Sequence, residues 1–290
     1  MATKRKSNRV VVVLLSDTHA GHKLGLMHPE VVLLDEHDQE YTPGQTETQR
    51  YLWELYQKYR GNVADLADGC PVVVIHNGDL TQGFRYGEHL VTPRKADQIR
   101  IAVKNLTEWY RDKRLHLAAF RVLVGSEAHT FGEGSAEVLV ADQLRALFPA
   151  VPIRALYHLL YEVQGDIIDV AHHGPFPGSR THLRGNSGRA YVRDLMTAEL
   201  LDGNKPARIV ARAHYHEYLR ETVRADANGK EYVADLLVTP SFSGIDDYVR
   251  RATKSKRKID HGLIALEFDG GLRDIYPLYQ QLEIRTKEAL

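Results

Sequence analysis

The sequence predicts an α/β fold with a parallel sheet at its core. Hydrophobic runs alternate with amphipathic stretches from Val10 to Pro149, in the order strand, helix, strand, helix, strand, helix. Such alternation favours parallel strands joined by right-handed helical crossovers. The first run, residues 10–15, contains only valine and leucine, without polar alternation. This pattern is typical of a strand buried on both faces.

Each strand of this half is followed by a helical pattern. The strands are expected at residues 10–15, 72–75 and 118–124. Apolar residues then recur with a helical period in three stretches, which begin near Thr46, Ile99 and Ala136. Ser135 stands directly before the third stretch, where its side chain is expected to cap the helix.

The second half of the chain is richer in strands. Strands are expected at 156–163, 167–171, 207–211, 217–224, 231–238 and 263–268, and a helix at 187–201. Asn228-Gly229 predicts one hairpin turn, and residues 164–166 predict another. No repeat or low-complexity linker divides the chain. We therefore expect a single domain over residues 1–290, with residues 1–9 as a basic, disordered tail.

The composition excludes several classes of protein. Lys and Arg together number 38, as do Asp and Glu, so no global charge draws the chain to nucleic acid or membrane. The apolar run near the N-terminus is too short for a signal peptide, and no run reaches the ~20 residues that span a bilayer. Cys70 is the one cysteine, so no internal disulfide is expected. We expect a cytoplasmic protein with no membrane partner.

Side chains that bind metals follow five of the predicted strands. These pairs are Asp17/His19, Asn77/Asp79, Glu127/His129, His172/His173 and His214/His216. Any one pair has an ordinary explanation, such as a turn or a surface histidine. Five pairs at strand ends predict a common site, because ligands of open α/β sheets bind beyond the carboxyl ends of the strands. Asp17 and His19 are two positions apart, so in extended backbone they would point to the same side.

The mixture of carboxylates and imidazoles indicates the kind of metal. It suits Mn, Fe, Zn, Ni or Co rather than Ca, which prefers oxygen ligands alone. The candidates outnumber the ligands of one ion, so we expect two divalent transition metal ions bridged by a carboxylate, for which we choose Asp79. Two ions ~3.5–4 Å apart hold the attacking and leaving oxygens of a displacement at phosphorus, and they lower the pKa of a bound water.

The series of pairs resembles the calcineurin-like metallophosphoesterases in order and spacing, over about residues 10–216. The resemblance implies a four-layer fold, a two-sheet β-sandwich flanked by helices. It implies that Asp79 serves both ions and so takes part in catalysis. The other ligands that it implies are Asp17, His19 and His216 for one ion, and His214 with either His172 or His173 for the second. His129 would be catalytic, assisting the leaving group.

The third pair departs from the family. The usual Gly-Asn-His-Asp/Glu, whose Asn binds the second ion, is replaced here by residues 125–129, Gly-Ser-Glu-Ala-His. Either Ser126 or Glu127 takes the place of the Asn, or the second ion binds more weakly. This form resembles a subgroup associated with phages and prophages, which favours nucleic acid or nucleotides as substrates.

Basic residues are the candidates for substrate binding. Arg180 and Arg184, just past the fourth pair, are placed to hold a phosphate bidentately, although a solvated loop explains them equally well. Asn77 is a third candidate. Residues 250–258 carry six basic side chains and no acid, which suits a phosphate backbone, and Tyr248 suits stacking on a base. Charge runs are, however, often merely solvated.

We therefore expect a metal-dependent phosphoesterase that hydrolyses phosphodiester bonds in nucleic acid or nucleotides through a metal-bound hydroxide. The alternatives within this class are a small-molecule phosphomonoesterase and a cyclic-nucleotide phosphodiesterase. The alternative of another class is a binding scaffold that keeps the fold without the chemistry, and the missing Asn is its only support.

Overall fold

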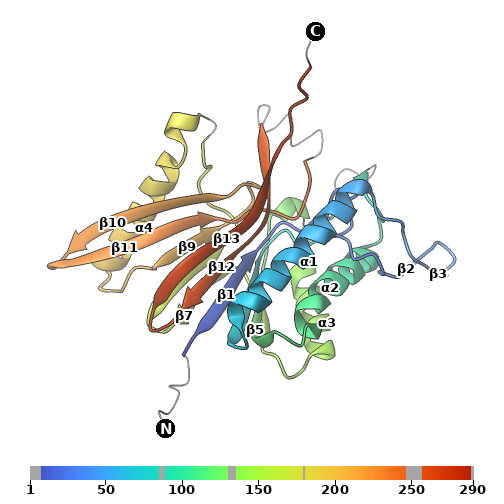
Figure 1. Cartoon of the computed structure of the whole chain (residues 1–290), viewed down its shortest axis with the longest axis horizontal. Helices are drawn as coiled ribbons and strands as arrows, with labels where there is room; N and C mark the ends of the chain where they lie inside the picture. The colour runs from blue at the N-terminus through green and yellow to red at the C-terminus, as the bar shows by residue number, and fades with distance from the viewer. Residues whose placement is uncertain (1–7, 85–88, 130–134, 179, 246–256, 289–290) are drawn as a thin grey trace.

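The computed structural model describes residues 8–84, 89–129, 135–178, 180–245 and 257–288. They form four layers, in which two sheets pack face to face between helices (Figure 1). The four-layer α/β expectation is confirmed. The expected single domain stays a prediction, and most of the basic tail lies outside the described residues.

The six-stranded sheet has the strand order β13-β12-β1-β4-β5-β6. Its strands are β1 (Val10–Leu15), β4 (Pro71–Asn77), β5 (His116–Leu123), β6 (Ile153–Leu156), β12 (Lys258–Phe268) and β13 (Leu272–Glu283). The first four are parallel, as the alternation predicts, whereas β12 and β13 pair antiparallel at the other edge.

The five-stranded sheet has the order β10-β11-β9-β8-β7. Its strands are β7 (His158–Val163), β8 (Asp166–Ala171), β9 (Ile209–Arg212), β10 (Leu219–Ala227) and β11 (Lys230–Val238). The pairs β8–β9 and β9–β11 are parallel, and both predicted hairpins are confirmed. A separate two-stranded ribbon joins β2 (Leu33–Leu34) and β3 (Glu40–Tyr41).

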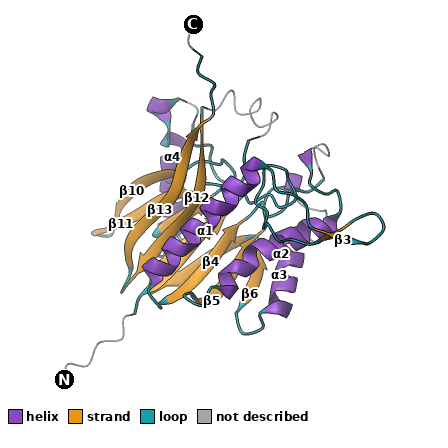
Figure 2. Cartoon of the chain, turned by 45° about the vertical axis from the view of Figure 1, so that its right-hand side comes forward, coloured by secondary structure: helices purple, strands orange, loops and turns teal. Residues whose placement is uncertain are grey.

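Helices cover the outer faces of both sheets (Figure 2). α1 (Glu47–Ala67), α2 (Lys95–Arg111) and α3 (Ala136–Leu147) pack on the six-stranded sheet, and α4 (Asn186–Leu201) packs on the other. Thr46 and Gln49 begin α1 with a capping box, and Ser135 caps α3 as predicted. Two short 3-10 turns, η2 (Glu127–His129) and η3 (Thr181–Leu183), lie in the loops.

β1 shows why its sequence lacks alternation. Val11 and Val13 face the helices, whereas Val12 and Leu14 face the second sheet, and all four are fully buried. Both faces of the strand therefore require apolar side chains. This central position fixes the polar residues that follow β1 near the middle of the molecule.

Candidate metal centre

The loops that carry the predicted ligands are joined by backbone hydrogen bonds. The amide of Asp17 donates to the carbonyl of Gly78 at 3.0 Å, and the amide of His19 donates to that of Asp79 at 3.1 Å. In the second sheet the amide of Ala213 donates to the carbonyl of His172 at 2.9 Å. The loops after β1 and β4, and those after β8 and β9, are thus held together in pairs.

The backbone at these positions is unusual. Five site residues adopt the left-handed conformation that L-amino acids other than glycine rarely adopt, with φ between 43° and 75°: Asp17, His19, Asp79, His214 and His216. Such strain persists where the surroundings impose it, and it concentrates at functional sites. It also corrects one expectation: β1 ends at Leu15, so Asp17 and His19 converge through left-handed turns and not along an extended strand.

One set of ligand atoms, which we call the first ligand group, consists of Asp17, His19, His216 and Asp79. Asp17 Oδ1 lies 3.3 Å from His216 Nε2 and 3.9 Å from His19 Nε2. The ligand atoms of these three residues lie within 4.8 Å of one another, and Asp79 lies within the same distance of His19 in one group and of Asp17 in another. Two carboxylates and two imidazoles thus lie close together.

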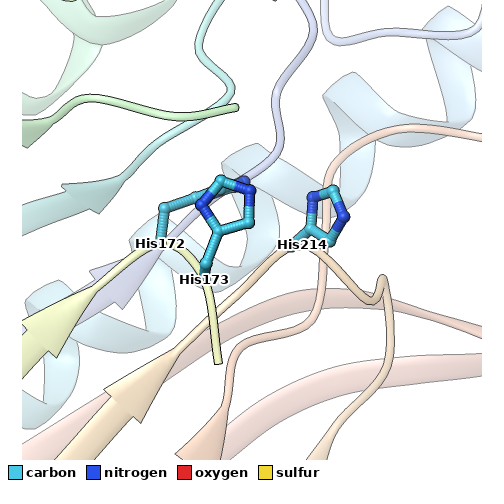
Figure 3. A group of neighbouring side chains, drawn as sticks. All are labelled: His172, His173 and His214. Atoms are coloured by element: carbon cyan, nitrogen blue, oxygen red, sulfur yellow. The ribbon is translucent and has the colours of Figure 1, made fainter. Parts of the chain in front are cut away.

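The second ligand group consists of Asp79, His172 and His214. Asp79 Oδ2 lies 3.1 Å from His172 Nε2 and 3.8 Å from His214 Nδ1. Asp79 therefore belongs to both groups. His173 lies beside the other two histidines, and Figure 3 shows the three rings together beyond the ends of β8 and β9.

Hydrogen bonds fix which nitrogen of two histidines faces the centre. His172 Nδ1 lies 2.6 Å from the carbonyl of Asn77, and His19 Nδ1 lies 3.1 Å from Gln82 Oε1. Both partners are acceptors, so each Nδ1 carries a proton and each Nε2 is the nitrogen left to bind a metal. Such support of a ligand's other nitrogen is typical of metal sites.

A divalent cation fits this arrangement. Among the described residues, the buried atoms Asp17 Oδ1 and His19 Nε2 have no hydrogen-bond partner. A buried polar atom left without a partner costs about 1–3 kcal/mol. Transition metal ions remove this cost, because they bind both kinds of donor.

Without a metal, the electrostatics of the centre are unbalanced. Burial lowers the pKa of His19 well below its usual value, so this ring stays neutral. Burial would also lower the pKa of His172, but the Asp79 carboxylate outweighs burial and raises it to about 9. Burial opposes ionisation of Asp79 as well, yet His172 and its other neighbours hold the pKa of that carboxyl well below its usual range. The centre therefore attracts positive charge.

The third pair places Ser126 against the bridging carboxylate. The Ser126 amide donates to Asp79 Oδ1 at 2.6 Å, and its hydroxyl lies 2.9 Å from Oδ1 and 3.0 Å from Oδ2. Glu127 is exposed on η2, and among the described residues it belongs to none of the groups that could hold a metal. His129 Nδ1 lies 2.8 Å from the Gln82 carbonyl, and its Nε2 lies 3.9 Å from Asp79 Oδ2.

Gln82, which orients His19, was missed from the sequence. Ser126 was named there as a candidate for the place of the Asn, and in the structure it holds the Asp79 carboxylate. Gly78 has φ +86°, and a Cβ there would lie 2.4 Å from His172 Nδ1; a Cβ on Gly125 would lie 2.1 Å from Asp79 Oδ1. Gly125 directly follows the predicted strand 118–124, and Gly78 directly follows β4 as observed, so a glycine at a strand end is the signal that could have identified them.

The predicted substrate residues are less central. Asn77 is fully buried, and its Nδ2 donates to the Ala171 carbonyl at 3.1 Å, so it joins β4 to β8. Arg184 Nη2 donates to the Tyr218 carbonyl at 2.7 Å, and Arg180 is exposed. Tyr248 and most of the basic run 250–258 lie outside the described residues. Of this run the structure describes only Arg257 and Lys258.

In the part of the chain that the structure describes, no helix is long and apolar enough to cross a membrane.

Comparison with known proteins gives only distant structural likenesses. No family model matches the chain, and no curated protein matches it. An archaeal phosphodiesterase is 10% identical, with 94% of this chain and 99% of that chain covered and a TM-score of 0.39. A predicted phosphoesterase from Streptococcus pneumoniae is 14% identical, with 95% of this chain and 98% of that chain covered and a TM-score of 0.34. Vps29 from Entamoeba histolytica, complexed with zinc, is 12% identical, with 95% of this chain and 99% of that chain covered and a TM-score of 0.33. At these TM-scores the likenesses carry no weight for the chemistry of this chain.

Proposed function

We propose that the protein is a dinuclear metal-dependent phosphoesterase of the calcineurin-like metallophosphoesterase type. The observation that supports this most strongly is the place of Asp79, which is buried between two groups of imidazole and carboxylate ligands and shared by both. The order of the motifs along the chain supports the same family. When bound, two divalent ions lower the pKa of a water and neutralise charge that develops on the phosphoryl oxygens.

The residues of the chain supply positioning and proton transfer. The first and second ligand groups would each hold one ion, on either side of Asp79, and ions bound there would orient the oxygens of a phosphoryl group. His129 Nδ1 is held by the Gln82 carbonyl, which turns Nε2 toward Asp79 and the centre. As an imidazolium, His129 donates the Nε2 proton to the departing oxygen.

We further propose a phosphodiester in nucleic acid or nucleotides as the substrate. The support is the Gly-Ser-Glu-Ala-His form of residues 125–129, which resembles the phage and prophage subgroup, and the exposed Arg180 near the second ligand group in sequence. A phosphomonoester or a cyclic nucleotide is the second candidate, because the metal centre itself suits both.

A non-catalytic scaffold is disfavoured by the buried unpartnered atoms. The unpartnered Asp17 Oδ1 and His19 Nε2 destabilise a metal-free fold, and five non-glycine residues of the site are strained. A scaffold gains nothing from these costs, whereas a metal centre requires the donors.

The test is hydrolysis of bis(p-nitrophenyl) phosphate with Mn²⁺, Ni²⁺, Zn²⁺ or Co²⁺ added. We expect activity in the native protein and a loss of at least about 1,000-fold in Asp79→Asn, since both ions lose their shared ligand and its charge. Asp38→Asn, at a carboxylate that is 77% exposed, is the matched control and should keep full activity. Equal activity in the native protein and Asp79→Asn would contradict the proposal.

Single-stranded DNA, a phosphomonoester and a cyclic nucleotide then separate the substrate classes. A nuclease should cleave DNA with a kcat/KM that falls steeply with salt, because phosphate contacts release counterions. If DNA is not cleaved and one of the small substrates is, the nucleic-acid proposal fails while the metal chemistry stands.

A further inference from the structure

We propose that His173 is a ligand of the second ion, so that three histidines and Asp79 form this site. The inference rests on the proposed function and deepens it. His173 would replace the Asn amide that is missing from residues 125–129. The two metal sites would then differ in their ligands.

The residues that stand where the Asn is expected do not supply an equivalent ligand. Ser126 directs both its amide and its hydroxyl to the Asp79 carboxylate, so its protons are used to hold the bridge. A neutral hydroxyl is also a weaker ligand for a transition metal than an imidazole. Glu127 is exposed on η2, and among the described residues it belongs to none of the four groups of ligand atoms. The second ion therefore needs a ligand from elsewhere.

His173 is placed to be that ligand. Its ring nitrogen lies within 4.8 Å of ring nitrogens of His172 and His214, and its ring centroid is 4.9 Å from each of theirs. Figure 3 shows the His173 ring together with those of His172 and His214, beyond the strand ends. An ion bound to His172 and His214 is thus within reach of His173 after a small side-chain adjustment.

The backbone that carries His173 is held in place. The Ala213 amide donates to the His172 carbonyl at 2.9 Å, and the Tyr215 hydroxyl donates to the Gly174 carbonyl at 2.6 Å, so the loops on both sides of the site are tied together. Gly174 packs so closely on the buried Arg212 that a Cβ would lie 2.6 Å from Arg212 Cγ. These contacts fix the approach of His173 to His214.

The donor sets predict different metals for the two sites. The first ligand group offers two carboxylates and two imidazoles, a set that suits Mn²⁺ or Fe²⁺ as well as Zn²⁺. With His173 the second site has three imidazoles and one carboxylate, which favours Zn²⁺, Co²⁺ or Ni²⁺ over Mn²⁺. The two ions should therefore differ in kind when both metals are offered.

Titration of the metal-free protein with Co²⁺ tests the inference. Calorimetry and the visible absorption of the bound ion measure the binding. We expect two sites in the native protein. In His173→Ala the second site should weaken by about 100-fold or more, because even an outer partner of a ligand is worth roughly 10–100-fold, and its absorption should change. The first site should be unchanged, and circular dichroism should match the native protein.

Two variants complete the experiment. His37→Ala removes a histidine that is 72% exposed between β2 and β3, and it should bind both ions normally. Glu127→Ala should also keep both sites. The inference is overturned if His173→Ala binds two ions with native affinity and spectrum, or if Glu127→Ala alone loses the second site. In either case a native protein that still binds two ions and hydrolyses phosphodiesters leaves the proposed function intact.

Discussion

The two ligand groups share Asp79 but differ in their access to solvent. In the first group the side chains of Asp17 and His19 are 0% and 6% exposed. The loop that carries them is joined by backbone hydrogen bonds to the loop that follows β4. In the second group His172 is buried, but His214 is 39% exposed and its neighbour His173 is exposed. One half of the centre is closed and the other opens to solvent.

The position of the strands does not explain the difference, because β1 and β9 are both internal strands of their sheets. The difference lies in the loops: the loop after β1 is buried, whereas His173 and His214 are exposed at the ends of β8 and β9. A buried, preorganised set of ligands holds its ion firmly, because little remains to be ordered on binding. If the centre binds two ions as proposed, we expect the first site to keep its ion and the second, more exposed site to exchange its ion and receive the phosphate.

Substitution of one ligand from each group should have the largest effect and should distinguish the two sites. Asp17→Asn removes a buried charge from the first site, and we expect at least a 1,000-fold loss of kcat, about 4 kcal/mol, together with loss of that ion. His214→Ala should weaken the second ion by about 100-fold and leave the first bound, so that excess metal restores part of the activity. Metal content and steady-state kinetics measure both. If excess metal restored the activity of Asp17→Asn but not that of His214→Ala, the second site and not the first would be the one that holds its ion firmly.

Gly78 tests how tightly the second group is packed. Gly78→Ala should destabilise the fold by about 2–4 kcal/mol, since the new methyl overlaps His172 and the residue keeps a left-handed φ. Gly69→Ala is the matched control, because Gly69 has a similar φ of +80° and nothing within 4 Å of a Cβ. It should cost only about 1–2 kcal/mol. Urea unfolding gives both values, and equal losses would show that the site tolerates the methyl.

The smallest expected effect is on the pH dependence of the metal-free protein. The pKa of His172 is about 9 in the folded state and near 6.5 when unfolded, so its stabilising effect is complete below pH 6.5 and disappears as the pH rises through about 9. The free energy of unfolding should therefore fall between pH 7 and 9. His172→Asn should remove this fall, and bound Zn²⁺ should abolish it because the metal replaces the proton. A flat profile in the metal-free native protein would contradict the assigned pairing of His172 with Asp79.

Much of the fold could be predicted because its signals are local. The apolar run of β1, the Asn228-Gly229 turn and the cap at Ser135 each specify one element, and the structure has all three. β6 and β13 were missed, β6 because it is four residues long and β13 because it is an edge strand with mixed polarity and Pro277.

The candidate site was predicted in part, for the same reason. Strand ends followed by metal ligands are visible in sequence, and seven of the eight predicted ligands lie in groups that could hold a metal, with Glu127 outside them. The contacts of Gln82 and Ser126 depend on which loops meet in space, and no spacing encodes that. Left-handed backbone at Asp17 and His19 was also invisible, because neither residue type requires it.

The number of ions bound per chain tests the central claim most directly. The metal-free native protein is titrated with Zn²⁺, and its metal content is measured by mass spectrometry. The native protein should bind two ions, and Asp79→Asn should lose both or retain one weakly. One ion or none in the native protein, or two ions bound equally well in Asp79→Asn, would contradict a centre bridged by Asp79.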